Sequence, residues 1–292
     1  MSTPGDYTSK FGPPLPTFLI CGAPKAGTTA LYEYCRQHPD ILMSTPKETD
    51  FFHKNHHKGV DWFRAHFDDW KGETAIGEAS VMTMPTPGAE ERVADLIPDV
   101  RLLFLLRDPV ERAYSDYLFN VEQGWIPPDV PFGRIIRDEI DVEGYSGEAL
   151  INRGLYLKHL RRFRKHFPRS QMRVLLSRDL KHETARIVQS VYAFIGVNED
   201  YSPGALERHN TTTYMQHGSV YRTLRTAWQP VKAVLDDDGL IGTVRDRVRS
   251  FFFAKGDKPE MRTEDRAYLR ERFEKPNAKL AEWLDRDLSH WL

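Results

Sequence analysis

The sequence predicts an α/β fold in which helices cover both faces of a central parallel sheet. Short apolar runs alternate along the chain with longer amphipathic stretches. A strand that is buried on both faces does not need alternating polar and apolar residues, and strands separated by helices pair in parallel. The chain has 292 residues, 40% of them hydrophobic, which suits one large domain of this kind.

The expected strands and helices alternate in order along the chain. The apolar runs predict strands at 17–21, 74–78, 101–106 and 172–177. The amphipathic stretches predict helices at 28–38, 89–98, 109–124, 154–167 and 183–196. Proline is favoured in the first turn of a helix and glycine directly after its end, and Pro109, Gly124 and Gly196 stand at such positions.

The domain organisation predicted from the sequence has three parts. Residues 1–16 are rich in proline, glycine and serine and contain no apolar run, which predicts a flexible leader rather than a signal peptide. Residues 17–292 are expected to form a single domain. The composition changes at 230–258, which predicts an insertion or a mobile flap.

Composition argues against several classes of protein. No apolar run approaches the ~20 residues of a membrane-spanning helix. The net charge of −1 argues against a nucleic-acid partner, so an anionic ligand needs a local cluster of donors. Cys21 and Cys35 are the only cysteines, so we expect no disulfide framework and a cytoplasmic location.

A glycine-rich turn between the first strand and the first helix predicts a phosphate site. Gly22 and Gly27 have the spacing of a Walker A loop, but Thr28 stands where the lysine of that motif belongs. Lys25 lies inside the turn instead, and Thr29 adds a second hydroxyl. Free amides at a helix start favour an anion. A plain turn with an exposed lysine is the alternative, and it does not explain why these residue types gather here.

The displaced lysine leaves more than one phosphate ligand open. A Mg²⁺-dependent kinase or triphosphatase needs a loop hydroxyl and a Walker B aspartate to hold the metal. Thr28 or Thr29 could serve with Asp108, although Arg107 intervenes between the apolar run and that aspartate. This function is kept as the alternative, together with a non-catalytic nucleotide-binding protein.

The sequence "PKAGTTAL" (24–31) resembles the 5′-phosphosulfate loop of the sulfotransferases that use 3′-phosphoadenosine 5′-phosphosulfate, PAPS. Within that superfamily it resembles the heparan-sulfate and related carbohydrate branch and its bacterial relatives. The resemblance implies a P-loop-like three-layer fold and transfer of the sulfuryl group from PAPS to a hydroxyl, or less readily an amine. It implies PAP as the product and no metal. It also implies that the donor is bound by Lys25, Ala26, Gly27, Thr28 and Thr29.

A second anion site is expected where the strand at 101–106 ends. Arg107 offers a planar fork that can engage a phosphate, and Ser115 adds a hydroxyl from the next helix. In the resembling family an arginine and a serine at this spacing bind the 3′-phosphate of PAPS. The neighbours Asp108, Pro109 and Glu111 are explained without a ligand, because they form a typical helix start.

The segment "PKETDFF" (46–52) supplies the candidate base. In the resembling family a glutamate before paired aromatic residues is the catalytic base, and that position here is Glu48. Sulfuryl transfer to an alcohol requires removal of the hydroxyl proton, which a carboxylate can accept. Lys25 can offset the charge on the leaving phosphate. The alternative is a capping box formed by Thr45 and Glu48 at a helix start.

The segment that follows the candidate base is expected to face the acceptor. Its histidines, His53, His56 and His57, lack the partner set of a metal site, so a solvated or acceptor-facing loop is expected. Its aromatic residues suit a small molecule or a carbohydrate as acceptor, and these are Trp62, Phe63 and Trp70.

The later part of the resemblance includes two departures from the family pattern. Tyr156 or Arg153 is expected to approach the nucleotide. The usual late Lys-Gly-aromatic loop is missing, and Tyr214 or Arg222 is expected to replace it. Ala79 stands where the heparan enzymes carry a lysine, which argues against a heparan-like acceptor.

Overall fold

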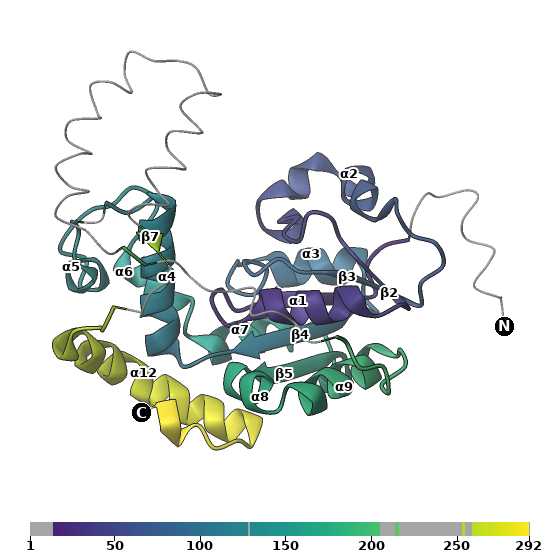
Figure 1. Ribbon diagram of the computed structural model, residues 1–292. Coiled ribbons are helices and arrows are strands. Elements are labelled where there is room, and N and C mark those ends of the chain that lie inside the picture. Colours follow the sequence, from purple (N-terminus) through teal and green to yellow (C-terminus); the bar gives the residue numbers. More distant parts are fainter. Residues whose placement is uncertain (1–13, 128, 205–213, 216–252, 255–258, 292) are drawn as a thin grey trace, which may run out of the picture. The chain divides into compact units, whose positions relative to one another are not determined.

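The computed structural model describes residues 14–127, 129–204, 214–215, 253–254 and 259–291 (Figure 1). The chain divides into two compact units. Unit 1 comprises Met1–Arg112, Asn152–Asn210 and Phe273–Leu292. Unit 2 comprises Ala113–Ile151 and Thr211–Arg272. Each unit is described below by itself.

Unit 1 is built on a parallel sheet whose strand order is β2-β3-β1-β4-β5. Its strands are β1 (Phe18–Gly22), β2 (Ile41–Met43), β3 (Ala75–Glu78), β4 (Arg101–Leu106) and β5 (Met172–Leu176). The register aligns Leu19 of β1 with Glu78 of β3 and with Leu102 of β4. Almost every residue of β1 and β4 is buried, which is why neither strand alternates in sequence.

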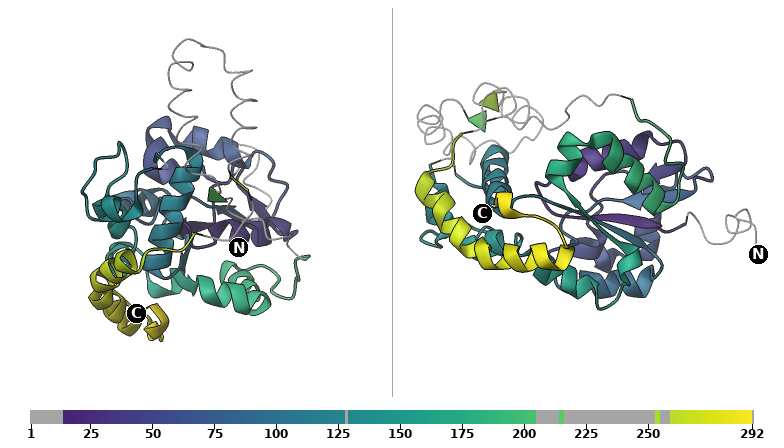
Figure 2. Two further views of the ribbon diagram at one scale, coloured as in Figure 1. Left: turned by 60° about the vertical axis from the view of Figure 1, so that its left-hand side comes forward. Right: turned by 90° about the horizontal axis from the view of Figure 1, so that it is seen from below.

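Helices lie on both sides of this sheet (Figure 2). They are α1 (Thr28–Gln37), α2 (Val60–Arg64), α3 (Ala89–Leu96), α7 (Tyr156–Phe163), α8 (Ser177–His182), α9 (Thr184–Ile195) and the end of α12 (Thr263–Leu284). Short helical turns are η2 (Phe51–Asn55), η3 (His56–Lys58), η4 (Ala65–Phe67), η5 (Arg169–Gln171) and η6 (Ser289–Trp291). Helices α1 and α9 pack together, and Phe163 of α7 packs edge-on against Phe104 of β4. The predicted three-layer α/β fold is confirmed.

Unit 2 contains most of α4 (Pro109–Gln123), then α5 (Phe132–Ile136), α6 (Gly147–Asn152) and the start of α12. Its antiparallel pair is β6 (Tyr214–Met215) with β7 (Phe253–Ala254). Tyr114 and Tyr117 pack against Phe132, with ring centroids 5.1 Å apart in both pairs. Arg137 and Asp265 form an ion pair at 2.6 Å that joins α5 to α12 inside this unit.

The predicted elements agree with the structure apart from their ends and a few short elements. The helix expected at 154–167 is shorter, because α7 covers only Tyr156–Phe163. The three residues of β2 were too few to be recognised, and the helical turns between 51 and 67 were not predicted. No helix in the described ranges is both long and apolar enough to cross a membrane.

Three predictions concern residues that the structure describes little or not at all. The leader at 1–16 and the flap at 230–258 lie outside the described residues, except for 14–16 and 253–254. Arg222 also lies outside them. The single domain over 17–292 stays a prediction.

Candidate functional site

The carboxyl ends of the five parallel strands place their following loops along one edge of the sheet, where ligands bind in open α/β folds. The loop Gly22–Gly27 follows β1, the loop 44–50 follows β2, and the loop 79–88 follows β3. Arg107 follows β4, and Ser177 follows β5. The residues that the sequence singled out therefore follow four of the five strands: Lys25 after β1, Glu48 after β2, Ala79 after β3 and Arg107 after β4.

The loop Gly22–Gly27 has a left-handed backbone that leads directly into the start of α1. Lys25 has φ 62° and Gly27 has φ 100°, so the chain is left-handed twice within three residues. Gly27 is the N-cap of α1, and the amides of the first turn, which begins at Thr28, point out of the helix start. A side chain at Gly22 would lie 2.6 Å from the carbonyl oxygen of Val81, so only glycine fits there.

Two side chains hold the carbonyl groups of this loop. The Arg107 guanidinium donates from Nη1 to the carbonyl oxygen of Lys25 at 3.1 Å. The Ser177 hydroxyl donates to the carbonyl oxygen of Ala26. The Ala23 and Ala26 amides donate to the carbonyl oxygens of Leu105 and Ala23, so the amides that this region offers to a ligand are those at the start of α1. Ser177 was missed in the sequence, where its only signal is its position directly after an apolar run.

Tyr156 lies behind Arg107. Its side chain is buried, and its hydroxyl donates to the carbonyl oxygen of Arg107 at 2.8 Å. Burial raises the pKa of this hydroxyl well above its usual value, so it remains a donor. The structure thus gives Tyr156 a role in placing Arg107, and direct contact with a nucleotide stays a prediction.

Glu48 lies on the loop 44–50 that joins β2 to η2. Its carboxylate forms an ion pair with Lys47 at 2.7 Å, and 39% of its side chain is exposed. The capping-box alternative is wrong, because no helix begins at Thr45. The next helical turn starts at Phe51, and Asp50 is its N-cap. Glu48 is therefore a solvent-accessible carboxylate at the strand-end edge.

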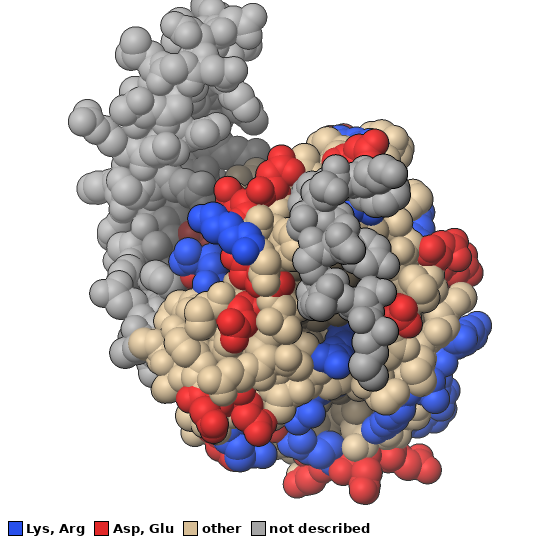
Figure 3. Space-filling model, turned by 90° about the vertical axis from the view of Figure 1, so that its right-hand side faces the viewer, with Lys and Arg blue, Asp and Glu red and all other residues tan. Residues whose placement is uncertain are grey.

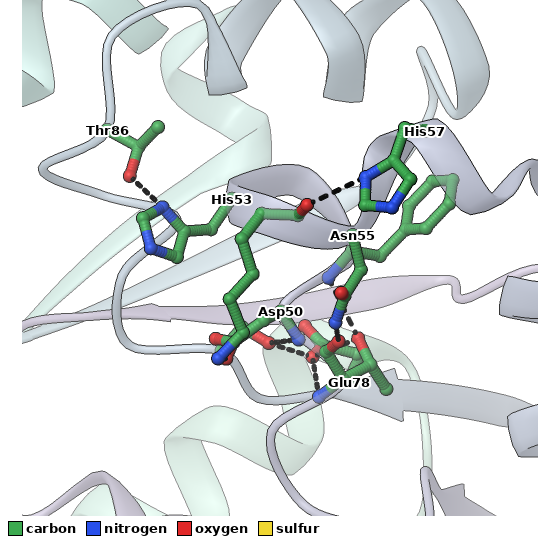
Figure 4. Close-up of polar contacts among 10 residues, drawn as sticks. Asp50, His53, Asn55, His57, Glu78 and Thr86 are labelled. Atoms are coloured by element: carbon green, nitrogen blue, oxygen red, sulfur yellow. Dashed lines mark hydrogen bonds and ion pairs between the residues drawn. The ribbon is translucent and has the colours of Figure 1, made fainter.

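A buried carboxylate that the sequence analysis did not single out is hydrogen-bonded to the loop 44–50, called the Glu48 loop below (Figure 4). Glu78 ends β3 and is 1% exposed. Its Oε1 accepts hydrogen bonds from Thr49 Oγ1 at 2.9 Å, from the Thr49 amide at 3.3 Å and from Ser80 Oγ. Burial raises the pKa of Glu78 to about 7, although the bonds from Ser80 and Thr49 oppose that shift. Its only signal in the sequence is a glutamate at the end of an apolar run.

The three histidines after Glu48 do not form a metal site. His53 Nδ1 contacts Thr86 Oγ1 at 2.9 Å, and His57 Nδ1 contacts the Lys54 carbonyl oxygen at 3.0 Å (Figure 4). His56 packs against the ring of Phe51. Across the described part of the chain, no group of three or more His, Cys, Asp or Glu side chains could hold a metal ion.

The predicted 3′-phosphate pair is divided between the two units. Arg107 belongs to unit 1, whereas Ser115 on α4 and Tyr214 on β6 belong to unit 2. The helix start between them is as predicted, because Asp108 Oδ1 accepts the Val110 amide at 2.8 Å. Binding of a nucleotide by Ser115 or Tyr214 stays a prediction.

Charges of both signs are mixed on the face of the molecule in Figure 3. Lys and Arg side chains gather along the lower right of this view, and Asp and Glu side chains lie above and below them. The presence of both signs agrees with the net charge of −1.

Comparison with known proteins identifies the family. A family model described as "Sulfotransferase domain" matches residues 15–283. Heparan sulfate glucosamine 3-O-sulfotransferase 3B1 of Mus musculus is 32% identical over 189 residues, which cover 63% of this chain and 46% of that protein. Bifunctional heparan sulfate N-deacetylase/N-sulfotransferase 1 of Xenopus tropicalis is 32% identical over 216 residues, covering 68% of this chain and 24% of that protein. This chain therefore spans less than half the length of either curated relative.

A solved structure is similar over nearly the whole chain. The sulfotransferase from Alicyclobacillus acidocaldarius has a TM-score of 0.71 at 26% identity, and the match covers 95% of this chain and 99% of that one. Together with the family model, this similarity confirms the predicted resemblance to PAPS sulfotransferases near the heparan-sulfate branch. The chain belongs to the sulfotransferase family.

Proposed function

We propose that this chain transfers the sulfuryl group of PAPS to an acceptor hydroxyl in one in-line step and releases PAP. The observation that carries this proposal is the arrangement of the loop Gly22–Gly27. Its backbone is left-handed at Lys25 and Gly27 and leads into the start of α1, where the first amides point out of the helix. Lys25 adds a charge, and Glu48 lies on a loop at the same edge of the sheet. Family membership supports PAPS as the donor.

The residues of the loop fit the phosphosulfate end of PAPS. Free amides at the start of α1, the hydroxyls of Thr28 and Thr29 and the ammonium group of Lys25 are donors suited to an anion. Arg107 donates to the Lys25 carbonyl oxygen from one nitrogen, and its planar fork has further N–H groups for the 3′-phosphate. Arg107 would therefore contact both the loop that binds the phosphosulfate and the 3′-phosphate. Ser115 would add a hydroxyl for the 3′-phosphate.

The remaining residues act on protons and charge. PAPS, when bound, supplies the sulfuryl group and a phosphate leaving group. Lys25 would offset the negative charge that develops on the leaving oxygen. Glu48 would accept the proton of the acceptor hydroxyl, because its carboxylate is accessible from solvent and lies on the loop after β2.

The acceptor is proposed to be a carbohydrate or a small molecule. The relatives named above include both O-sulfotransferases and N-sulfotransferases of heparan sulfate, and a hydroxyl is favoured here because a carboxylate base suits it. Trp62 offers a partly exposed ring near this loop, with the Lys58 ammonium 4.4 Å from its centre. Ala79 in place of a lysine argues for an acceptor less acidic than heparan sulfate. A cytoplasmic location stays a prediction from the cysteine content.

A binding comparison followed by a transfer assay tests the proposal. PAP should bind in the presence of a chelator, whereas ATP with Mg²⁺ should bind more weakly. Transfer of labelled sulfate from PAPS to a panel of carbohydrate and small-molecule alcohols should then be lost in Glu48→Gln. A preference for ATP that a chelator abolishes would instead favour a Mg²⁺-dependent kinase or triphosphatase. Tight PAP binding without transfer to any acceptor would favour a non-catalytic nucleotide-binding protein.

A further inference from the structure

Three successive backbone amides directly after Glu48 depend on one buried carboxylate. The Thr49 amide donates to Glu78 Oε1 at 3.3 Å. The Asp50 amide donates to Ser80 Oγ at 2.8 Å, and that hydroxyl donates to Glu78 Oε1. The Phe51 amide lies 3.3 Å from Thr49 Oγ1, which donates to the same oxygen at 2.9 Å. Each amide thus reaches Glu78 directly or through one hydroxyl.

These contacts fix the peptide in a conformation that it would not adopt by default. Asp50 has φ 52°, in the left-handed region that non-glycine residues rarely occupy. The carbonyl oxygen of Thr49 accepts from Asn55 Nδ2 at 2.7 Å, which closes the turn from its other side. Burial of Glu78, Thr49 and Ser80 excludes water as a competing partner. The backbone of the turn that follows Glu48 is therefore held by Glu78, directly and through the two hydroxyls.

We propose that Glu78 is a positioning residue, whose carboxylate orients the Glu48 loop for proton removal from the acceptor. The inference rests on the role proposed above for Glu48. A carboxylate oxygen accepts several hydrogen bonds at once, whereas a protonated carboxyl group must also donate one. The arrangement of three converging donors therefore suits the ionised form of Glu78, and the loop should loosen when Glu78 is protonated.

Titratable groups in the described part of the chain that bear on Glu78 include Cys21, Glu48 and Asp50. Cys21 on β1 is buried, and burial together with Glu78 raises the pKa of its thiol, so it stays neutral over the working range. Glu48 on the loop opposes ionisation of Glu78 by its like charge. Asp50, the N-cap of η2, is paired with Lys54 at 2.8 Å. A fall in activity below about pH 7 that disappears in Glu78→Gln therefore reports on Glu78 itself.

The test compares Glu78→Gln and Thr49→Val with Thr49→Ser, which keeps the donor hydroxyl. Thr184→Val is a matched control, since the hydroxyl of Thr184 at the start of α9 donates to the carbonyl oxygen of Leu180 on α8, outside this loop. Hydrogen exchange of the backbone amides at 49–51 and the kcat and KM for PAPS are measured on the full chain. We expect Glu78→Gln and Thr49→Val to speed exchange there and to lower kcat about 10- to 100-fold at an unchanged KM for PAPS.

The expected result for Thr49→Ser and Thr184→Val is exchange and kcat close to wild type. Unchanged exchange at 49–51 in Glu78→Gln overturns the inference, and so does faster exchange with an unchanged kcat. If Glu78→Gln does not fold, the pair at Thr49 decides in the same way. Absence of sulfuryl transfer by the wild-type chain counts against the proposed function. Hydrogen exchange at 49–51 tests separately whether Glu78 orders the loop, because it does not depend on activity.

Discussion

The loop after β1 and the loop after β2 occupy the same edge of the sheet but are held in different ways. The loop Gly22–Gly27 gets its shape from its own backbone, with positive φ angles at three of its positions. The loop 44–50 has no glycine, and a buried carboxylate on another strand holds it through Thr49. The end of the site that is proposed to bind a phosphate group is thus specified locally, whereas the end that carries the proposed base is specified by tertiary contacts.

This difference has a physical origin. Binding an anion needs many small donors at a fixed spacing, which backbone amides supply when glycine allows the turn. Removing a proton needs one carboxylate aimed at one point, so its support must come from the surrounding fold. Variants that alter each loop should therefore fail in different ways, and four of them break or sharpen the comparison.

Lys25→Ala should have the largest effect. Loss of the ammonium group leaves the developing charge on the leaving phosphate uncompensated, which should lower kcat about 100- to 1,000-fold. Transfer of labelled sulfate from saturating PAPS measures it. Lys165→Ala is the control, because that lysine is exposed on the segment after α7. Turnover of Lys25→Ala near the wild-type level would refute the role given to the lysine.

Glu78→Gln should change how stability depends on pH. The pKa of Glu78 is about 7 in the folded protein against an ordinary value of 4.5. The folded chain therefore keeps a proton that the unfolded chain has lost between these values. The stabilising contribution is fully present below about pH 4.5 and is lost as the pH rises through about 7, a change of about 3 kcal/mol.

Glutamine does not titrate, so the free energy of unfolding of Glu78→Gln relative to wild type should rise by about 3 kcal/mol between about pH 4.5 and pH 8. Urea unfolding at a series of pH values measures the difference. Parallel curves for the two proteins would show that Glu78 ionises normally. If the two curves diverge over this range of pH and kcat also falls in the variant, the ionised Glu78 lowers the stability of the fold while it orders the loop for catalysis. Such a trade-off between stability and activity is common at functional sites.

Gly27→Ala should weaken the loop after β1 alone. An added Cβ would meet no atom closer than 3.7 Å, so the effect comes from the φ of 100°, which should cost about 1–2 kcal/mol. Gly88→Ala is matched to it, because Gly88 is the N-cap of α3 with φ 78° and open space around it. Both variants should lose similar stability in thermal unfolding. PAP affinity should fall only in Gly27→Ala. An equal fall in both variants would contradict a specific role of the loop Gly22–Gly27 in binding PAP.

The same difference explains what the sequence could predict. The strands β1 and β4 and the loop at Gly22–Gly27 were visible because their signals are local: an apolar run, two glycines and a lysine at fixed spacing. The Asp108 cap was visible for the same reason. Glu78 was not visible, because its function depends on Thr49, which lies 29 positions away in the chain.

Glu48 and Tyr156 show that a local sequence pattern does not identify the partner of a residue. The sequence around Glu48 fits a capping box, yet no helix begins there. The Thr49 amide donates to Glu78, and the next helical turn begins at Phe51. Tyr156 was expected to approach the nucleotide, which stays a prediction, and its hydroxyl donates to the carbonyl group of Arg107. The sequence did not indicate this partner or the contact between Glu78 and Thr49, because both depend on packing between segments distant in sequence.

Ser177→Ala should have the smallest effect and separates the two ways of holding a loop within one site. Its hydroxyl is a tertiary support for the otherwise self-supported loop after β1, through the carbonyl oxygen of Ala26. Loss of this hydrogen bond should cost about 1 kcal/mol of stability and lower PAP affinity severalfold, by about the same energy. Calorimetric titration with PAP measures it. Ser190→Ala is the control, because its hydroxyl makes the same kind of bond, to the Ile187 carbonyl oxygen at 2.7 Å, within α9. If PAP affinity is unchanged in Ser177→Ala, the glycines and Lys25 shape the loop without help. If it falls as far as in Gly27→Ala, the contrast between the two loops is one of degree.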